Sequence, residues 1–151
     1  MTSVTTQRTN DAIGAFRFKV ELDGLLVGGF SEVTGIQSET EVMEYPEGGL
    51  NTHVHILPKH TKYSRIVLKR GITQSSELWD WYDGVAGGTI KRKSGSVILH
   101  NHAAKELCRW NFFEAYPVKW HGPDLNATSG NVAVESIEIV HNGLKTIFSK
   151  S

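Results

Sequence analysis

The sequence has one cysteine, no long apolar run and no excess of charge of either sign, and each absence excludes a class of protein. Cys108 alone cannot form an internal disulfide, and its place in the apolar stretch 107–113 predicts a buried, unreactive thiol. No apolar run approaches the roughly 18 residues of a transmembrane helix. Sixteen basic and sixteen acidic residues give a formal net charge of zero, whereas a general binder of nucleic acid or anionic membranes carries a basic excess.

Motifs of catalysis and of metal binding are also missing. The chain has no GxSxG elbow for a nucleophilic serine, no P-loop and no GxGxxG. The pairs His53-x-His55 and His100-x-His102 would each place two imidazoles on one face of a strand, but no third ligand follows at a recognisable spacing. We therefore expect no catalytic residue, no metal site and no cofactor, and we interpret these histidines as surface or interface side chains.

Length and polarity predict a simple domain organisation. The chain of 151 residues has the size of one domain with its own hydrophobic core. The first residues are polar, lack periodicity and contain no apolar segment of a signal peptide. We expect a flexible N-terminal arm at 1–11 and a single domain at 12–151.

Alternating apolar residues predict that most of the chain is strand. Apolar residues from Phe16 to Leu22 alternate with charged ones and are followed by the turn signal Asp23-Gly24, so we expect a β-hairpin over 16–30. The stretch 46–62 contains two prolines and a Gly-Gly pair, which predicts a long functional loop. Further strands are expected, in chain order, at 39–45, at 65–70, at 89–100 in two pieces around Ser94-Gly95, at 107–120, at 132–141 and at 144–148.

The apolar alternation of the predicted strands is interrupted at some positions, and each interruption predicts a local structural feature. The alternation slips at Phe112-Phe113 and again at Glu135-Ser136, which predicts a bulge or a strand buried on both faces. Asn142-Gly143 predicts a hairpin turn into the last strand.

One helix stands out between the strands. Leu78, Trp81, Tyr82 and Val85 fall at i, i+3, i+4 and i+7, after Ser75 and Ser76 as N-cap candidates, and glycines end the run. We interpret this aromatic stripe as the face of the helix that packs against the core. The predicted fold class is mainly β: an antiparallel β-sandwich or barrel with one flanking α-helix.

Several segments are distinctive in their order along the chain: Gly35-Ile36, EVMEYPEGGLN at 41–51, IVLKRG at 66–71, Leu78-Trp79-Asp80-Trp81, AYPVKWHGPDL at 115–125 and VESIEIVHNGL at 134–144. Together they resemble the inner tail-tube proteins of contractile-tailed phages and of extracellular contractile injection systems. The resemblance covers roughly 12–148. It implies a structural subunit, not an enzyme, of which six copies form a ring. The rings stack into a hollow tube that is driven through a target envelope and can carry cargo.

The resemblance also implies partners and a location. The homo-hexamers of the tube meet a contractile sheath protein, baseplate, tube-initiator and spike proteins, and a tube terminator cap. A protein toxin or DNA is the expected cargo in the lumen, and no stable membrane insertion of the subunit itself is expected. Assembly is expected in the bacterial cytoplasm, as a component of a virion or of a particle released outside the cell.

Site roles follow from the same resemblance. Ring-to-ring contact is expected at Tyr45, Pro46, Glu47, Gly48, Gly49, Leu50 and Asn51. Leu78, Trp81 and Tyr82 are expected to seat the helix on the barrel. Pro117, Trp120 and Pro123 are expected to shape a loop at a subunit boundary.

Two alternatives remain open from sequence. Within the same architecture, the chain could be a type VI secretion tube protein or a baseplate tube initiator that stops at one ring. From a different class, it could be a small metal-dependent hydrolase or a ligand-binding β-sandwich. Stoichiometric zinc in the purified protein would favour the hydrolase, and its absence would favour the tube.

Overall fold

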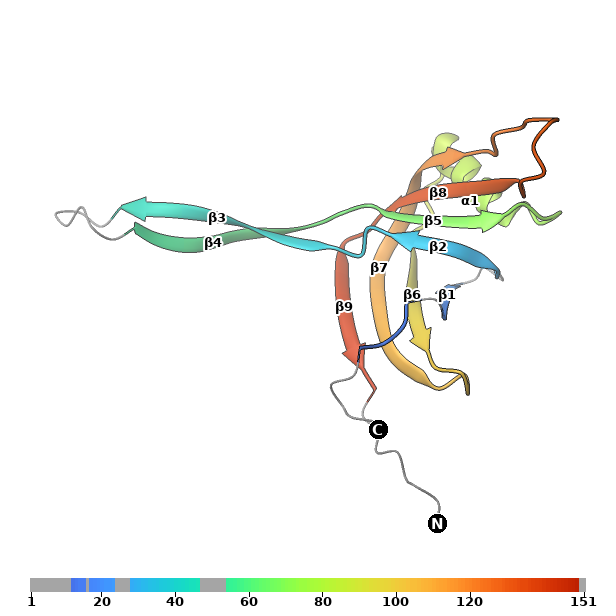
Figure 1. Ribbon diagram of the computed structural model, residues 1–151. Helices are drawn as coiled ribbons and strands as arrows, with labels where there is room; N and C mark the ends of the chain where they lie inside the picture. The colour runs from blue at the N-terminus through green and yellow to red at the C-terminus, as the bar shows by residue number, and fades with distance from the viewer. Residues whose placement is uncertain (1–11, 16, 24–27, 47–53, 150–151) are drawn as a thin grey trace, which may run out of the picture.

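The computed structural model describes residues 12–15, 17–23, 28–46 and 54–149, and within these ranges the chain is mostly antiparallel strand with one helix (Figure 1). The predicted arm at 1–11 lies outside the described residues. The elements are β1 (Phe18–Leu22), β2 (Phe30–Thr34), β3 (Ser38–Pro46), β4 (Val54–Tyr63), β5 (Ile66–Gly71), α1 (Glu77–Ala86), β6 (Lys93–His100), β7 (Glu106–His121), β8 (Val134–Val140) and β9 (Gly143–Phe148).

Seven strands form one sheet that folds over on itself at β7. The first layer contains β1, β6, β9 and residues 106–115 of β7, and the second layer contains β2, β5, β8 and residues 116–121 of β7. The two layers run across each other (Figure 1). At the fold, Glu114 has a φ of 54° and the buried face changes from Phe112 to Ala115. The slip predicted at Phe112-Phe113 is therefore confirmed as a bend that turns one strand from layer to layer.

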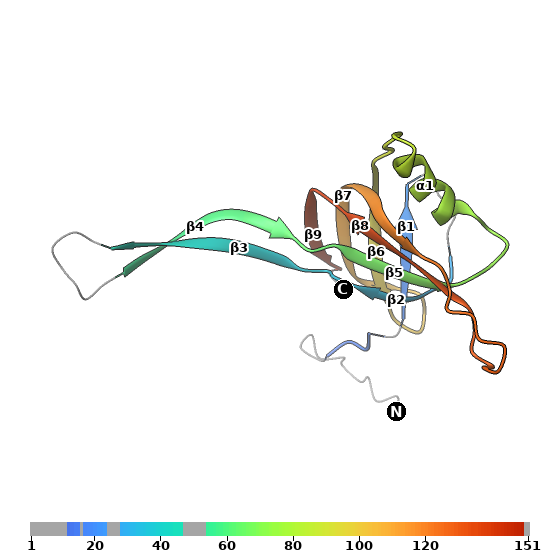
Figure 2. The same cartoon turned by 90° about the horizontal axis from the view of Figure 1, so that it is seen from above.

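The core lies between the two layers and is closed on one side by α1 (Figure 2). Trp81 is buried there, and its Nε1–H donates a hydrogen bond to the Lys91 backbone oxygen at 2.8 Å. The sheet does not close into a barrel, because β1 and β2 at its ends do not pair with each other among the described residues. The predicted class, antiparallel β with one flanking helix, is confirmed. The core residues are Val20, Leu22, Ile66, Leu68, Leu78, Trp81, Val97, Phe112, Ala115, Ile137 and Ile139.

One predicted hairpin pairing and two predicted turns are wrong, because distant partners outweigh local signals. Among the described residues, β1 pairs with β6 and β2 with β5, so the two strands expected to form the hairpin over 16–30 do not pair with each other. Gly24 of the expected turn lies outside the described residues. Ser94-Gly95 lies inside the continuous strand β6, where Gly95 pairs with both neighbouring strands. Asn142-Gly143 is a bend and not a hairpin, since β8 and β9 pair with the same edge of β7 and Asn142 N–H donates to the Phe113 oxygen at 2.9 Å.

Two further predictions are corrected in the strands themselves. The alternation does not slip at Glu135-Ser136, because Glu135 is buried on the same face as Ile137 and Ile139. Most of the loop expected at 46–62 is strand, since β4 begins at Val54 and pairs with β3.

The boundary loop expected around Pro117 and Trp120 is also wrong in its structure. Both residues lie in β7, and only Pro123 follows the strand. The sheet accepts Pro117, which lacks an N–H, because the pairing with β8 shifts register directly after it.

Candidate assembly surface

The most prominent surface of the molecule is a two-stranded ribbon made of β3 and β4, here called the projecting hairpin. It extends far from both layers in each of two perpendicular views (Figures 1 and 2). Its register continues that of the second layer: Thr34 pairs with Val67 and, four residues further on each strand, Ser38 pairs with Tyr63. The projecting hairpin is a two-stranded sheet of its own that continues the β2–β5 pair outward in the same register.

The junction between layer and hairpin is held by specific contacts. Gly35 has a φ of 88°, and a Cβ there would collide with the Arg65 backbone oxygen, so a residue with a side chain does not fit. Ser64 Oγ donates to Gln37 Oε1 at 3.0 Å across the two strands. Tyr63 packs against the His141 ring at the end of β8, with centroids 5.3 Å apart. These contacts fix the direction in which the hairpin leaves the body.

The outer half of the projecting hairpin carries exposed apolar side chains on both faces. Because successive side chains of a strand alternate, Val42, Ile56 and Val54 share one face. The other face carries Met43 and Leu57, followed by Tyr45. All six side chains are exposed, Ile56 by 63%. An exposed apolar ribbon of this size is unusual for a protein that works alone, and it marks an interaction surface.

The inner half of the hairpin is charged instead. Glu41 on β3 forms an ion pair with Lys62 on β4, and its other carboxylate oxygen lies 3.2 Å from His60 Nε2 on the same strand. The hydrogen bond from Lys62 is the main reason that the pKa of Glu41 lies below its ordinary value, and the same contact raises the pKa of Lys62. The strands are therefore cross-linked near the body, and the apolar part is carried outward.

Open strand edges are further candidate assembly surfaces. Among the described residues, β1, β2 and β9 each pair with one strand only. Unpaired edges of this kind accept strands from other chains.

A buried ion pair that sequence reasoning missed stiffens the second layer. Arg70 Nε donates to Glu135 Oε1 at 2.6 Å, and the two side chains are only 3% and 7% exposed. Arg70 also donates to the Ser75 oxygen just before α1, and Trp120 Nε1 donates to the second Glu135 oxygen at 3.2 Å. The sequence did contain a signal for this burial. Arg70 lies two residues after Leu68 and Glu135 lies two residues before Ile137, so each charged side chain shares a strand face with a core residue.

The expected helix residues lie on α1, and one expected boundary residue, Trp120, contacts the same helix. Leu78 and Trp81 are buried in the core, and Tyr82 packs against it from the edge. Trp120 stacks edge-on against Trp79 of α1, with centroids 4.8 Å apart. No contact with another copy tests the boundary role of Pro117, Trp120 and Pro123, which stays a prediction.

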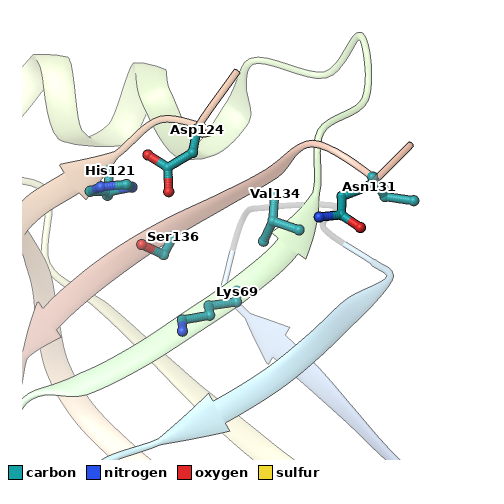
Figure 3. A pocket seen from close by; sticks show the side chains of 7 residues that line it. Lys69, His121, Asp124, Asn131, Val134 and Ser136 are labelled. Atoms are coloured by element: carbon teal, nitrogen blue, oxygen red, sulfur yellow. The ribbon is translucent and has the colours of Figure 1, made fainter. Parts of the chain in front are cut away.

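A shallow pocket of about 310 Å³ lies on the second layer (Figure 3). Its side chains include Ser136, His121 and Asp124, the residue types of a hydrolase triad. No hydrogen bond joins any two of these three described residues, so the serine has no base and the histidine no orienting carboxylate. The lining residues are Lys69, His121, Asp124, Asn131, Val132, Val134 and Ser136.

The other chemical candidates have no catalytic geometry. Within the described ranges no three histidine, cysteine or acidic side chains gather to hold a metal ion. Cys108 is buried, which raises the pKa of its thiol. No helix among the described residues is long and apolar enough to span a membrane. The expected ring contacts at 47–51, and His53, lie outside the part of the chain that the structure describes.

Comparison with known proteins gives a consistent result. The model of the family described as T4-like virus tail tube protein gp19 matches residues 14–145. A search of curated proteins finds no match. The fold is similar to a chain of the sheath-tube complex of PVC, an extracellular contractile injection system, with a TM-score of 0.87, 24% identity, and coverage of 99% of this chain and 100% of that one.

Two other solved structures share the fold. A chain of the anti-feeding prophage cap, described as the tube terminating cap, has a TM-score of 0.85 and 22% identity, with 98% of this chain and 100% of that chain covered. Hcp1 from Flavobacterium johnsoniae is more distant, with a TM-score of 0.55 and 20% identity over 89% of this chain and 97% of that chain.

Proposed function

Because the chain belongs to the T4-like virus tail tube protein gp19 family, we propose that it is the repeating inner-tube subunit of a contractile injection system. As a tail tube protein it is a structural subunit and not an enzyme. Six copies form a ring, rings stack into a hollow tube, and contraction of a surrounding sheath drives the tube through a target envelope.

The projecting hairpin is the observation that carries this proposal. Its outer half exposes apolar side chains on both faces, and an extended neighbour in a ring or in the next ring would cover them. Burying such area is favourable by about 25 cal/mol per Å². A contact between the hairpin and a different surface of the neighbour is heterologous. Such a contact gives a ring when the rotation between copies closes, and a second contact along the axis then stacks rings without limit. Tyr45 and Pro46 end β3 beside the proposed ring-to-ring segment 45–51.

The proposed partners are taken from the complexes in which the similar chains were solved. One of those chains comes from a sheath-tube complex and another from a terminating cap. A third similar chain, with a TM-score of 0.81 and 23% identity, comes from the anti-feeding prophage baseplate. By analogy we propose that a sheath surrounds the tube of this chain, that a baseplate with initiator and spike lies at one end, and that a terminator lies at the other. Assembly takes place in the bacterial cytoplasm, before release of the particle.

Ile56→Lys tests the role of the hairpin. Ile56 is exposed in the single subunit, so a lysine leaves folding intact, but it places a charge in an interface that excludes water. We expect negative-stain electron microscopy to show tubes for the unmodified protein and none for Ile56→Lys, with identical circular dichroism spectra.

Ile90→Lys is the matched control. Ile90 is another exposed isoleucine, at 52%, outside the hairpin and between α1 and β6. Tubes should form with this variant. Normal tubes from Ile56→Lys would contradict the assignment of the hairpin as an assembly element.

A tube initiator is the second candidate, because one similar chain belongs to a baseplate. An initiator stops at a single ring, whereas a repeating subunit continues. Sedimentation of the purified protein separates the two: one discrete species of ring size indicates an initiator, and a broad distribution of long particles indicates the repeating subunit.

A further inference from the structure

We propose that the bend at Asn142-Gly143 is a site of spontaneous chemical modification, and that its isoaspartate product loosens the root of the projecting hairpin. The reaction converts the asparagine to isoaspartate or aspartate through a cyclic imide, with water as the co-reactant. It is a property of the single folded subunit and does not depend on the proposed tube function.

Asn142 combines three features that favour this reaction. It is the only asparagine in the chain that glycine follows. It lies in the bend between the end of β8 and the start of β9, outside both strands. Its side chain is exposed and makes no hydrogen bond to another described residue. By contrast, the side-chain oxygens of three other asparagines are held by hydrogen bonds that they accept: Asn101, Asn111 and Asn126.

Asn131 is the matched comparison within the chain. Its side chain is also exposed and also makes no hydrogen bond among the described residues, but Val132 follows it. The branched side chain of valine hinders the approach of its own main-chain nitrogen to the neighbouring amide, whereas glycine has no side chain to interfere. Asn142 should therefore react while Asn131 stays unchanged.

The reaction has two steps, and both balance without an oxidant or a reductant. In the first, the Gly143 nitrogen gives up its proton and attacks Asn142 Cγ, and the side-chain nitrogen leaves as ammonia with that proton. In the second, water opens the five-membered imide. Cleavage of the new bond between nitrogen and Cγ leaves aspartate. Cleavage of the original peptide bond leaves isoaspartate, in which the main chain runs through Cγ and is longer by one methylene group.

The extra methylene would fall between two anchored groups. On one side, Asn142 N–H donates to the Phe113 oxygen at 2.9 Å. On the other side, the Gly143 oxygen accepts a hydrogen bond from His141 Nδ1 at 3.0 Å. A longer connection cannot keep both contacts in place, and β9 holds Gly143 against β7. We expect the bond to His141 to be lost.

His141 links this bend to the hairpin. Its ring packs against Tyr63 at the end of β4, with centroids 5.3 Å apart, and against Phe112 of the core at 6.3 Å. The bond to Gly143 fixes the orientation of the ring, so its loss removes the support on which Tyr63 rests. The hairpin root, residues 61–66, should then open more often.

Mass spectrometry of the incubated full-length subunit tests the site. A single tryptic peptide, 120–145, contains Asn126, Asn131 and Asn142, because no lysine or arginine interrupts it. Fragmentation of this peptide locates each conversion of amide to acid. We expect acid to accumulate at Asn142 with time, in proportion to the hydroxide concentration, while the other two remain amides. No acid at Asn142, or equal acid at Asn131, would overturn the site.

Gly143→Ala tests the imide route. The new Cβ would lie 3.5 Å from Phe113 Cδ2, an ordinary contact, so the variant should fold. The methyl group hinders attack by the main-chain nitrogen, and the rate of acid formation at Asn142 should fall several-fold. An unchanged rate would contradict the route through Gly143.

Amide hydrogen exchange tests the consequence for the hairpin. The isoaspartate form is separated chromatographically and compared with the unmodified protein and with Asn142→Asp, which adds the same charge without the methylene. Exchange at 61–66 should be faster in the isoaspartate form alone. Equal exchange in the isoaspartate and unmodified forms would overturn the link to the hairpin. Equally fast exchange in Asn142→Asp would assign the effect to charge and overturn the role of the methylene.

Discussion

At the scale of single residues, the Arg70–Glu135 pair shows what the sequence could and could not reveal. The structure buries the aliphatic neighbours Leu68 and Ile137 on the strand face that they share with the charged pair. The charged residues in the same phase were not assigned, because burial of a charge depends on a partner 65 positions away that a single sequence does not identify. Phase gives the face of a side chain, but only the fold supplies the partner that makes a buried charge tolerable.

Glu135→Ala should destabilise the subunit strongly. The substitution leaves the Arg70 guanidinium buried without its carboxylate and removes the acceptor of Trp120. Breaking a buried pair on one side costs about 3–5 kcal/mol, which a shift of the urea midpoint would measure.

Glu32→Ala is the matched control, because it breaks an ion pair at the surface of the same layer. It removes the partner of Lys69 at the surface, where both side chains are about half exposed, and an exposed pair contributes about 0–1 kcal/mol. Equal losses for the two variants would show that the Arg70–Glu135 pair does not stabilise the second layer.

At the scale of elements, the sequence predicts whether a segment is helix or strand, but it does not predict which strands pair. The helix and the strands at 65–70 and 107–120 follow from periodicity, and each appears close to its expected place. The turn predictions failed because a glycine after a polar residue can either form a turn or leave room in a strand for a neighbouring side chain. A single sequence does not distinguish these two roles. Gly95 sits in a strand because the Phe112 ring crosses over it, and that ring comes from an element far along the chain.

Gly95→Ala should therefore be destabilising, although alanine is harmless at most strand positions. An added Cβ would collide with the Glu21 backbone oxygen and with the Phe112 ring. Overpacking of this kind costs about 1–3 kcal/mol, to be measured by chemical denaturation.

Gly130→Ala is the control for the same chemical change, because nothing lies within 4 Å of the position that the new Cβ would occupy. Its stability should equal that of the unmodified protein. If Gly95→Ala were equally neutral, the close approach of Phe112 would not be what selects glycine in β6.

At the scale of the whole molecule, the single subunit is incomplete. Its core is closed by two layers and one helix, yet the outer half of the projecting hairpin exposes apolar side chains, and β1, β2 and β9 each pair with one strand only among the described residues. The sequence contained part of this result: a strand was predicted at 39–45, where β3 lies, but 46–62 was interpreted as a loop. The two prolines suggested that interpretation, and the structure accommodates one at the end of β3 and the other beside a register shift in β4.

Cryo-electron microscopy of the purified protein, with and without its baseplate seed, tests most directly whether identical copies complete the subunit. We predict hollow tubes of stacked six-subunit rings in which the projecting hairpin of every copy lies against a neighbour. Tubes with the hairpins free in solvent, or only monomers at high concentration in the presence of the seed, would contradict this prediction.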